Sequence, residues 1–443
     1  MTSLLIRNGT IITMNPARQV LAGDIYIEDG RIVEIPAVQK TADQVIDARD
    51  RLVLPGFVQV HVHLNQSLFR GMADDMDVVD WLRLRIWPLE QAHNPESVYA
   101  AARLSIAEMV RGGTTTAVSL ETLRHTEAAF EAADGMGFRA VIGNAMMDRW
   151  EVGTEMVGED ADTALRRSLD LLDRYHGQGG GRLHFAFCPR GTRNATDSLW
   201  RQVVELARQR GVRIHTHAAE NQEQTERLAG FGGSEVQYLA DMGAVGPNLV
   251  VAHAIWLTPE EHDLLSRAGA HVAHCPSANF KLASGVAPVP EMMSKGINVA
   301  LGADGAPCNN NMDAFVEMRL AALIHKPRRG PTSMPALKVL EMLTVNGARA
   351  AGLESEVGSL EPGKRADIML INRRKLRAWP SLAADPVSQV VYEHQSSDVD
   401  TVIIDGQVLL EGGRFTRWDE DEILDEAQNS LRDLLQRVPG LKS

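Results

Sequence analysis

The chain has 443 residues, of which 44% are hydrophobic and 23% charged, and its formal net charge at pH 7 is −13. This composition is typical of a globular protein, and the acidic balance argues against nucleic acid or an anionic membrane surface as a partner. The three cysteines are far apart and odd in number, which argues against a disulfide framework. No apolar run suits a signal peptide or a membrane span. We therefore expect a soluble, cytoplasmic protein that acts on a small molecule.

Both ends of the chain contain short apolar runs joined by tight turns. Asn-Gly or Asp-Gly pairs between such runs indicate β-hairpins, and they stand at residues 8–9, 29–30 and 405–406. These patterns predict a small β-sandwich domain built from both chain ends, with a larger domain inserted between them and an amphipathic helix at the end. The predicted bounds are 1–55 and 358–420 for the sandwich, 56–357 for the inserted domain and 421–443 for the helical segment.

In the inserted domain, strand patterns alternate with helix patterns. After an opening strand within residues 54–64, strands are expected at 114–119, 139–143, 184–188, 213–217, 249–253, 271–274 and 297–301. Helices are expected at 97–111, 127–136, 197–209, 233–242 and 259–267. Alternation of this kind implies a parallel sheet, and eight such units imply an α/β fold of the (β/α)8 or TIM-barrel type.

Metal-ligating side chains recur where the predicted strands end. His61 and His63 close the opening strand, His217 closes the fifth strand, His253 the sixth, and Asp304 follows the eighth. Active groups of a barrel come from the C-terminal ends of its strands, so these side chains should converge. Three imidazoles and a carboxylate suit Zn²⁺ or Fe²⁺ with one position left for water. We predict a divalent ion, with Zn²⁺ favoured, on His61, His63, His217 and Asp304.

Two details refine this metal site. His215 lies on the same strand face as His217, one step deeper, but the spacing of His217 to Glu220 favours His217 as the ligand. No lysine occurs between Lys40 and Lys281, so the fourth strand cannot supply a lysine that bridges two ions. We therefore expect one metal ion, which would lower the pKa of a bound water towards neutrality.

A second set of residues is predicted to carry protons. Glu220 lies three residues after His217, where a carboxylate can reach the substrate instead of the metal. It would act as general acid and base, protonating a ring nitrogen while hydroxide attacks the neighbouring carbon. His253 would orient the hydroxide or polarise the substrate, and Asp304 would also shuttle a proton from the water.

Several motifs together resemble the amidohydrolase superfamily, in the branch that holds nucleoside and triazine deaminases and chlorohydrolases. They are His61-Val62-His63, His217-Ala218-Ala219-Glu220, Val251-Ala252-His253, the stretch 276–285, Gly302-Ala303-Asp304-Gly305, and the junctions at 55–56 and 363–367. The resemblance implies a metal-dependent barrel with a flanking β-sandwich that removes an amino group from an N-heterocycle. It also implies a homodimer or homotetramer.

Within that branch the substrate stays open. The stretch 68–75, Trp81-Leu82 and 87–90 resemble deaminases of 5′-deoxyadenosine, methylthioadenosine and S-adenosylhomocysteine, a likeness by which Glu90 would bind ribose hydroxyls. Those enzymes carry a histidine where this chain has Arg190, and an arginine near the place of Asn144. Residues 173–177 and 180–182 instead resemble triazine chlorohydrolases and melamine deaminases. An adenosine-type nucleoside is therefore predicted, with a triazine or free base as the alternative.

Five residues are the predicted substrate contacts. Glu90 is predicted from the resemblance, and Arg190 and Asn144 are predicted because they occupy the positions where this chain departs from it. Trp87 lies in the first βα loop of the predicted barrel, and His274 precedes the stretch 276–285.

Overall fold

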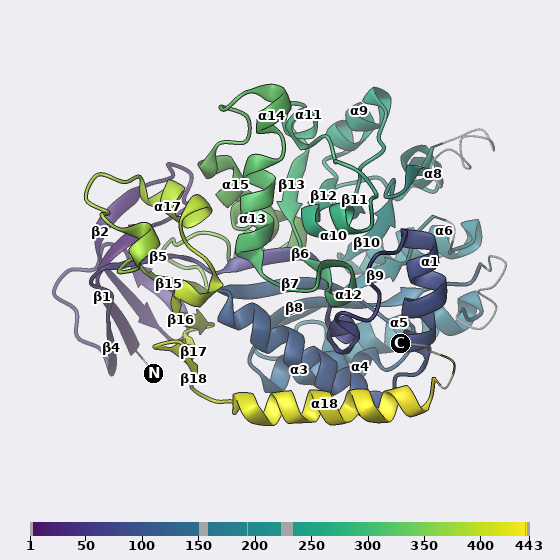
Figure 1. Cartoon of the computed structure of the whole chain (residues 1–443), viewed down its shortest axis with the longest axis horizontal. Helices are drawn as coiled ribbons and strands as arrows, with labels where there is room; N and C mark the ends of the chain where they lie inside the picture. Colours follow the sequence, from purple (N-terminus) through teal and green to yellow (C-terminus); the bar gives the residue numbers. More distant parts are fainter. Residues whose placement is uncertain (1–2, 150–157, 193, 223–233, 439, 441–443) are drawn as a thin grey trace. The chain divides into compact units, whose positions relative to one another are not determined.

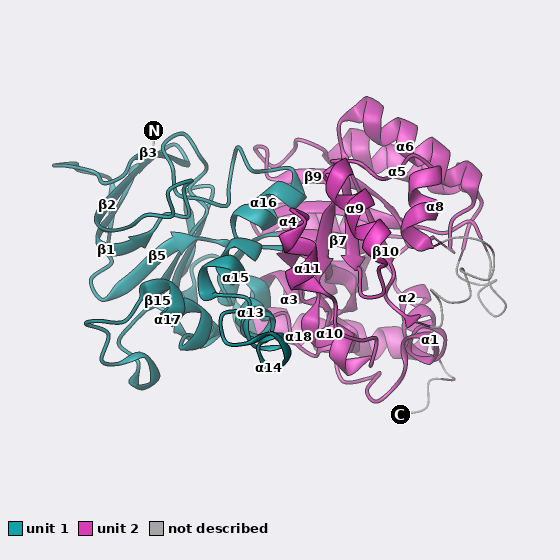
Figure 2. Cartoon of the chain, turned by 90° about the horizontal axis from the view of Figure 1, so that it is seen from above, with its two compact units in different colours: residues 1–59, 107–116, 313–420 teal, residues 60–106, 117–312, 421–443 magenta. Residues whose placement is uncertain are grey.

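The computed structural model describes residues 3–149, 158–192, 194–222, 234–438 and 440. The chain forms two compact units, drawn in two colours in Figure 2. Unit 1 consists of Met1–Gln59, Ala107–Thr116 and Asp313–Glu420, and unit 2 of Val60–Ile106, Ala117–Met312 and Asp421–Ser443. Residues 313–357 thus group with the chain ends, and the C-terminal segment groups with most of the barrel.

Unit 1 is built on a nine-stranded sheet to which both chain ends contribute. In Figure 1 the purple N-terminal strands and the yellow-green C-terminal strands belong to this sheet, in the order β18-β17-β16-β15-β5-β1-β2-β3, with β4 beside β1. Its strands are β1 (Ser3–Ile12), β2 (Val20–Glu28), β3 (Arg31–Glu34), β4 (Gln44–Asp47), β5 (Arg51–Pro55), β15 (Ile368–Asn372), β16 (Val399–Ile404), β17 (Gln407–Glu411) and β18 (Arg414–Phe415). Apolar residues from seven of these strands share one core, which includes Ile6, Ile25, Val53, Leu370 and Ile403.

The hairpin predictions for this sheet have different outcomes. Asp29-Gly30 joins β2 to β3 and Asp405-Gly406 joins β16 to β17, each pair with positive φ at both residues, as a tight hairpin turn requires. The predicted turn at Asn8-Gly9 is wrong, because β1 runs through it and pairs with β2 on both sides. The register shifts between Ile6 and Gly9, so this Asn-Gly pair forms a bulge instead.

Unit 1 also contains short helices, which come after the last barrel strand in the chain. Four of them precede β15 and three lie between β15 and β16. They are α13 (Ala314–Leu323), α14 (Lys326–Arg329), α15 (Ala336–Met342), α16 (Val345–Ala351), η3 (Leu376–Ala378), α17 (Pro386–Tyr392) and η4 (Ser396–Asp398).

The second sheet is the predicted parallel barrel. Its order is β13-β12-β11-β10-β9-β8-β7-β6-β14. The two ends of this order, β13 and β14, are pieces of one chain segment: β13 pairs with β12 and β14 pairs with β6, so the ring closes as eight strands. The strands are β6 (Phe57–His63), β7 (Thr114–Glu121), β8 (Arg139–Met146), β9 (Leu183–Pro189), β10 (Arg213–Ala218), β11 (Leu249–His253), β12 (His271–His274), β13 (Asn298–Leu301) and β14 (Asp304–Gly305).

Four of the helices that follow the barrel strands, α5, α6, α8 and α9, begin at side-chain caps. Asp160, Thr196, Ser234 and Thr258 each accept a backbone N–H at the start of a helix, as N-caps do. The helices are α3 (Pro95–Arg111), α4 (Thr126–Gly135), α5 (Ala161–Tyr175), α6 (Asp197–Arg210), α8 (Glu235–Asp241), α9 (Pro259–Ala268), α10 (Pro276–Lys281), α11 (Val289–Ser294) and α12 (Ala306–Asn309). Helix α5 was not predicted, and Gly233, the predicted start of α8, lies outside the described residues.

A long excursion follows β6 and contributes to the site described below. It consists of η1 (Leu64–Phe69), α1 (Val78–Trp81), the π-helical turn η2 (Leu82–Ile86) and α2 (Trp87–Gln91). The C-terminal helix α18 (Glu420–Gln436) packs Ala427 and Leu434 into the core made with Leu68, Phe69 and Leu89 of that excursion. Within the described residues, no helix has both the length and the apolar character needed to cross a bilayer.

Candidate metal centre and active site

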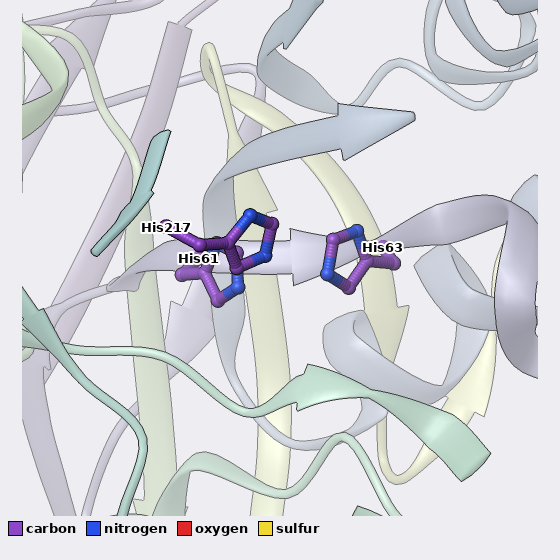
Figure 3. A group of neighbouring side chains, drawn as sticks. All are labelled: His61, His63 and His217. Carbon is purple, nitrogen blue, oxygen red and sulfur yellow. The ribbon is translucent and has the colours of Figure 1, made fainter. Parts of the chain in front are cut away.

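Four strand ends bring five predicted side chains together. His61 and His63 lie on β6, where Figure 3 shows their rings with that of His217 from β10. The ring centroids of His61 and His217 are 4.8 Å apart, and those of His61 and His253 are 5.4 Å apart. Asp304 points its Oδ1 to within 3.4 Å of Nε2 of His61 and 3.2 Å of Nε2 of His63. These ligand atoms therefore face a common point at the C-terminal end of the barrel.

Two of the histidines are oriented by backbone carbonyl groups. Nδ1–H of His63 donates to the carbonyl oxygen of Leu120 at 2.5 Å, and Nδ1–H of His217 donates to that of Arg190 at 2.6 Å. A carbonyl can only accept, so Nδ1 carries a proton in both rings and Nε2 is the nitrogen that can bind a metal ion. Such an outer contact is the usual way in which proteins fix the tautomer of a metal-binding histidine.

The other two histidines are oriented by side chains. Nδ1 of His253 lies 2.9 Å from the amide oxygen of Asn279, and Nδ1 of His61 lies 2.9 Å from Nε2 of His215. His215, the alternative ligand considered from the sequence, thus lies behind His61 instead of beside His63. The sequence analysis did not single out Asn279, although this residue lies in the stretch 276–285 that carries part of the family resemblance.

The donors fit a divalent cation. Within the described residues, two overlapping sets have ligand atoms within 4.8 Å of one another, namely His61 with His63 and His217, and His61 with His253 and Asp304. Nε2 of His61 is fully buried and makes no hydrogen bond to the described protein, which is costly unless a further group binds there. Burial lowers the pKa of His61 to about 4, so this ring is neutral at pH 7 and can donate a lone pair.

The carboxylate of the set is charged. Burial alone would favour the neutral acid, but the neighbouring side chains of His61, His63 and His253 hold the pKa of Asp304 well below its ordinary value. An ionised carboxylate beside imidazole nitrogens is a ligand combination that suits Zn²⁺ and similar ions.

The backbone is strained at three of the strand ends. Ala219, His253 and Asp304 have φ values of 53°, 72° and 62°. Residues other than glycine in this left-handed region cost about 1–3 kcal/mol each and cluster at functional sites. The strain turns the chain sharply as each strand ends, which keeps the side chains of these loops at the barrel mouth.

Glu220 is the predicted proton carrier, and its surroundings suit that role. Its Oε2 lies 3.8 Å from Nε2 of His253, and the side chain lines the cavity next to the metal-binding group. Burial raises the pKa of Glu220 against the opposing charge of His253, and the charges of Asp304 and Glu235 raise it further. A carboxyl group whose pKa is raised towards neutrality can both donate and accept a proton at ordinary pH.

The sequence analysis missed two buried carboxylates, Glu235 and Glu121, that bind the backbone next to Glu220 and His63. Glu235, in the first turn of α8, accepts from the backbone N–H of Ala219 and, at 2.8 Å, from the hydroxyl of Thr192. Glu121, at the end of β7, accepts from the backbone N–H groups of Leu64 and Asn65 at 3.0 and 3.1 Å, directly after His63. The sequence does not mark Glu235, because acidic residues are common in the first turn of a helix. Glu121 could have been noticed, because it is a charged residue at the end of an otherwise uncharged strand.

A cavity opens in front of this group. The residues that line it are His63, Val78, Trp81, Leu82, Trp87, Arg190, Gly191, Thr192, Asn194, His217, Ala218, Glu220, Glu235, His253, Leu282 and Asp304. The indole N–H groups of Trp81 and Trp87 are buried and find no acceptor in the described part of the chain. The wall therefore combines apolar surface with donors that a polar heterocycle can satisfy.

The predicted substrate contacts are only partly brought together. Trp87 and Arg190 line the cavity, whereas Glu90, Asn144 and His274 are not among the described residues that line it. Glu90 is buried behind the wall, where Nη1 of Arg190 and Nε2 of Gln66 each donate to its carboxylate at 2.8 Å.

Asn144 and His274 have different surroundings. Ser168 of α5 donates to Oδ1 of Asn144 at 2.8 Å, so the amide of this β8 residue points to the helix layer and away from the barrel mouth. His274, at the end of β12, is 1% exposed and thus as deeply buried as His253. Its role as a substrate contact stays a prediction.

Known proteins share this arrangement of sequence and fold. The model of the amidohydrolase family matches residues 52–409. A 5′-deoxyadenosine deaminase of Methanosarcina mazei is 36% identical over 442 residues, which cover 99% of this chain and 100% of that protein. A 5-methylthioadenosine/S-adenosylhomocysteine deaminase of Syntrophomonas wolfei is 36% identical over 439 residues, 98% of this chain and 99% of that protein.

A solved structure agrees with this result. The crystal structure of an adenosine deaminase from Xanthomonas campestris with bound zinc superposes with a TM-score of 0.91 at 29% identity, covering 98% of each chain. The predicted α/β barrel with its additional sheet is thereby confirmed. With a histidine and aspartate group at the strand ends of a closed parallel barrel and matches along almost its whole length, the chain belongs to the amidohydrolase family of hydrolases.

Proposed function

We propose that this enzyme is a metal-dependent aminohydrolase that releases ammonia from an adenosine-type nucleoside, such as 5′-deoxyadenosine, methylthioadenosine or S-adenosylhomocysteine. The observation that carries the proposal is Glu220, whose carboxyl group lines the cavity beside His253 and the metal-binding group and has a raised pKa. The full-length similarity to deaminases of these compounds supports the choice of substrate.

The proposed cofactor is one divalent ion, Zn²⁺, held by His61, His63, His217 and Asp304. When bound, it supplies a water molecule of lowered pKa at neutral pH. A single ion is supported by the end of β9, where Pro189 is followed by Arg190 and not by a lysine that could bridge two ions.

The protein's own groups have distinct tasks in the proposed reaction. Glu220 donates a proton to the ring nitrogen next to the amino-bearing carbon, which makes that carbon more electrophilic. Asp304 accepts a proton from the attacking water, and the amine leaves as ammonia after it has gained a proton. Nε2 of His253 lies 3.8 Å from Glu220 and 3.9 Å from Asp304, so it can hold the attacking oxygen between the two carboxylates. Asp304 passes its proton to the amine, the C–N bond breaks, and the attacking oxygen gives its remaining proton to Glu220, so that a ring carbonyl replaces the amino group.

The cavity wall supports a flat heterocycle as the substrate. Trp81 and Trp87 offer apolar surface and two indole N–H groups that lack acceptors in the described chain. Aromatic side chains bind the face of a base through apolar contact and their edges bind its acceptors.

The test is ammonia release from 5′-deoxyadenosine, methylthioadenosine, S-adenosylhomocysteine, adenosine, guanine and melamine. We expect turnover of the adenosine compounds and a loss of about 10²- to 10⁴-fold in kcat for Glu220→Gln. The matched control is Glu260→Gln, which alters an exposed glutamate at the start of α9 and should leave kcat unchanged. Release of ammonia only from melamine, or of chloride or alkylamine from triazines, would contradict the nucleoside assignment.

A further inference from the structure

A loop of unit 1 exposes three large apolar side chains. It consists of residues 374–382, which lie between β15 and α17 and include η3. Leu376 and Leu382 are completely exposed and Trp379 is 56% exposed, whereas no other large apolar side chain of the described residues is more than 65% exposed. Single exposed apolar residues are normal on a protein surface, but three within seven residues form a patch of the kind that marks an interaction site.

The base of this loop is fixed by hydrogen bonds, so its apolar side chains are held in the solvent. Nε2 of Gln389, a buried residue of α17, donates to the carbonyl oxygen of Ala378 at 3.2 Å. Nη2 of Arg373 donates to the carbonyl oxygen of Ser381 at 3.2 Å and to Oε1 of Gln389 at 2.9 Å. These bonds hold the backbone on both sides of Trp379. A loop that is already ordered loses little conformational entropy when a partner binds it.

The loop is basic, although the protein as a whole is acidic. Residues 373–382 contain four cationic side chains and no carboxylate, whereas the chain has a net charge of −13. Lys375 and Arg377 pair with the buried carboxylate of Asp398. Arg374 is exposed, and its side chain has no acceptor within the described chain. Two such loops would repel each other, because their like charges would be brought together. The loop therefore suits an acidic partner surface.

The same chain has such a surface around the start of α18, the yellow helix of Figure 1. Residues 419–426 contain six carboxylates and no cationic side chain. Arg103 and Arg111 of α3 pair with three of these carboxylates. Leu424 is 51% exposed, and the exposed carboxylate of Asp425 beside it has no ion pair or hydrogen bond within the described chain. This acidic segment thus combines an exposed leucine with an unpaired negative charge.

We propose that the 374–382 loop of one copy binds the 419–426 segment of a second copy of this chain. In this contact the apolar side chains of the loop cover Leu424, and Arg374 pairs with Asp425. An apolar centre with a charged rim is the usual composition of a protein interface. The loop and the segment are different surfaces of one chain, so two copies that close around a twofold axis form the contact twice. The inference concerns assembly and does not depend on the proposed aminohydrolase function.

The first experiment measures the association of the full-length protein by sedimentation velocity over a concentration series. We expect the wild type to sediment as an assembly of two or more copies. Arg374→Glu and Asp425→Arg each bring like charges together, so each should raise the Kd of association by about tenfold or more. The variant with both changes restores an opposite pair and should return to within about threefold of the wild-type Kd. Arg201→Glu, at an exposed position in α6, is the control and should leave the Kd unchanged.

Three results of this experiment would overturn the inference. They are a monomeric wild type, wild-type association of both single variants, and a double variant that associates no more tightly than the single ones. The double variant keeps the test valid if one charge reversal disturbs folding, because its association can be compared with the wild type directly.

The second experiment tests the apolar part of the contact with Leu376→Ser and Leu382→Ser combined in one chain. Both side chains are completely exposed, so their loss removes no packing within the protein and should leave the circular dichroism spectrum unchanged. We expect the Kd of association to rise by about tenfold or more. Val38→Ser, at a position of unit 1 that is 65% exposed, is the matched control. Unchanged association of the leucine variant, or a monomeric wild type that sediments with phosphatidylserine vesicles, would overturn the inference, and the latter result would assign the loop to a membrane surface.

Discussion

Glu235 is expected to hold the turn that places Glu220, the proposed catalytic carboxylate. Its Oε2 accepts from the backbone N–H of Ala219, the residue before Glu220, and its Oε1 accepts from the hydroxyl of Thr192 at 2.8 Å. Ala219 has a φ of 53°, so the turn is strained and depends on its surroundings. Replacement of Glu235 by alanine removes the acceptor of a backbone N–H that is nearly inaccessible to solvent, since Ala219 is 1% exposed.

The size of the effect follows from that lost contact. A buried N–H without an acceptor costs about 1–3 kcal/mol. If this cost is relieved by a shift of the turn, transition-state stabilisation by Glu220 falls by a similar amount, which is a loss of about 5- to 150-fold in kcat/KM. Glu235→Gln keeps one acceptor oxygen for the backbone N–H of Ala219, so the kcat/KM of this variant should fall by no more than about tenfold.

The assay is ammonia release from 5′-deoxyadenosine, measured together with the bound metal and the melting temperature. Thr192→Val isolates the second contact, because it removes the hydroxyl while the contact of Glu235 with Ala219 stays. We expect a smaller loss for Thr192→Val than for Glu235→Ala, with the metal content of both variants unchanged. A Glu235→Ala enzyme within twofold of the wild-type kcat/KM would refute the positioning role. A parallel loss of metal would show that Glu235 acts on the metal centre instead.

Three further predictions concern the metal, the barrel and the C-terminal helix. Dialysis against a chelator should abolish ammonia release and added Zn²⁺ should restore it, whereas full activity of the metal-free protein would contradict the proposed role of the cofactor. Gly302→Ala should reduce both metal content and melting temperature, since its Cβ would clash with the carbonyl oxygen of His61, and overpacking costs about 1–3 kcal/mol. A variant with the wild-type metal content and melting temperature would contradict this prediction. Leu434→Ala in α18 should lower the free energy of unfolding by about 2–5 kcal/mol, because this side chain is fully buried. Leu435→Ala, at a position 37% exposed, should change the free energy of unfolding by no more than about 0.5 kcal/mol, and equal losses for the two variants would contradict the packing of α18.

Local sequence signals predicted those elements whose partners are near in the chain. The hairpins at 29–30 and 405–406 were predictable because a tight turn and its two strands are contiguous, so two residues with positive φ fix the pairing. The same signal failed at Asn8-Gly9. There β2 pairs with β1 on both sides of the bulge, and this longer ladder outweighs the preference of two residues for a turn.

The sequence by itself determined the barrel and the convergence of His61, His63, His217 and Asp304. Parallel strands that close into a ring bring their C-terminal ends to one face, so a polar residue at each strand end is placed by the topology alone. The tertiary structure decided which of the remaining polar residues face the cavity. Arg190 and Glu90 are 100 residues apart and pair, and the amide of Asn144 turns to the helix layer. Contacts of this kind depend on strand register and on helices packed from elsewhere in the chain, which no local pattern encodes.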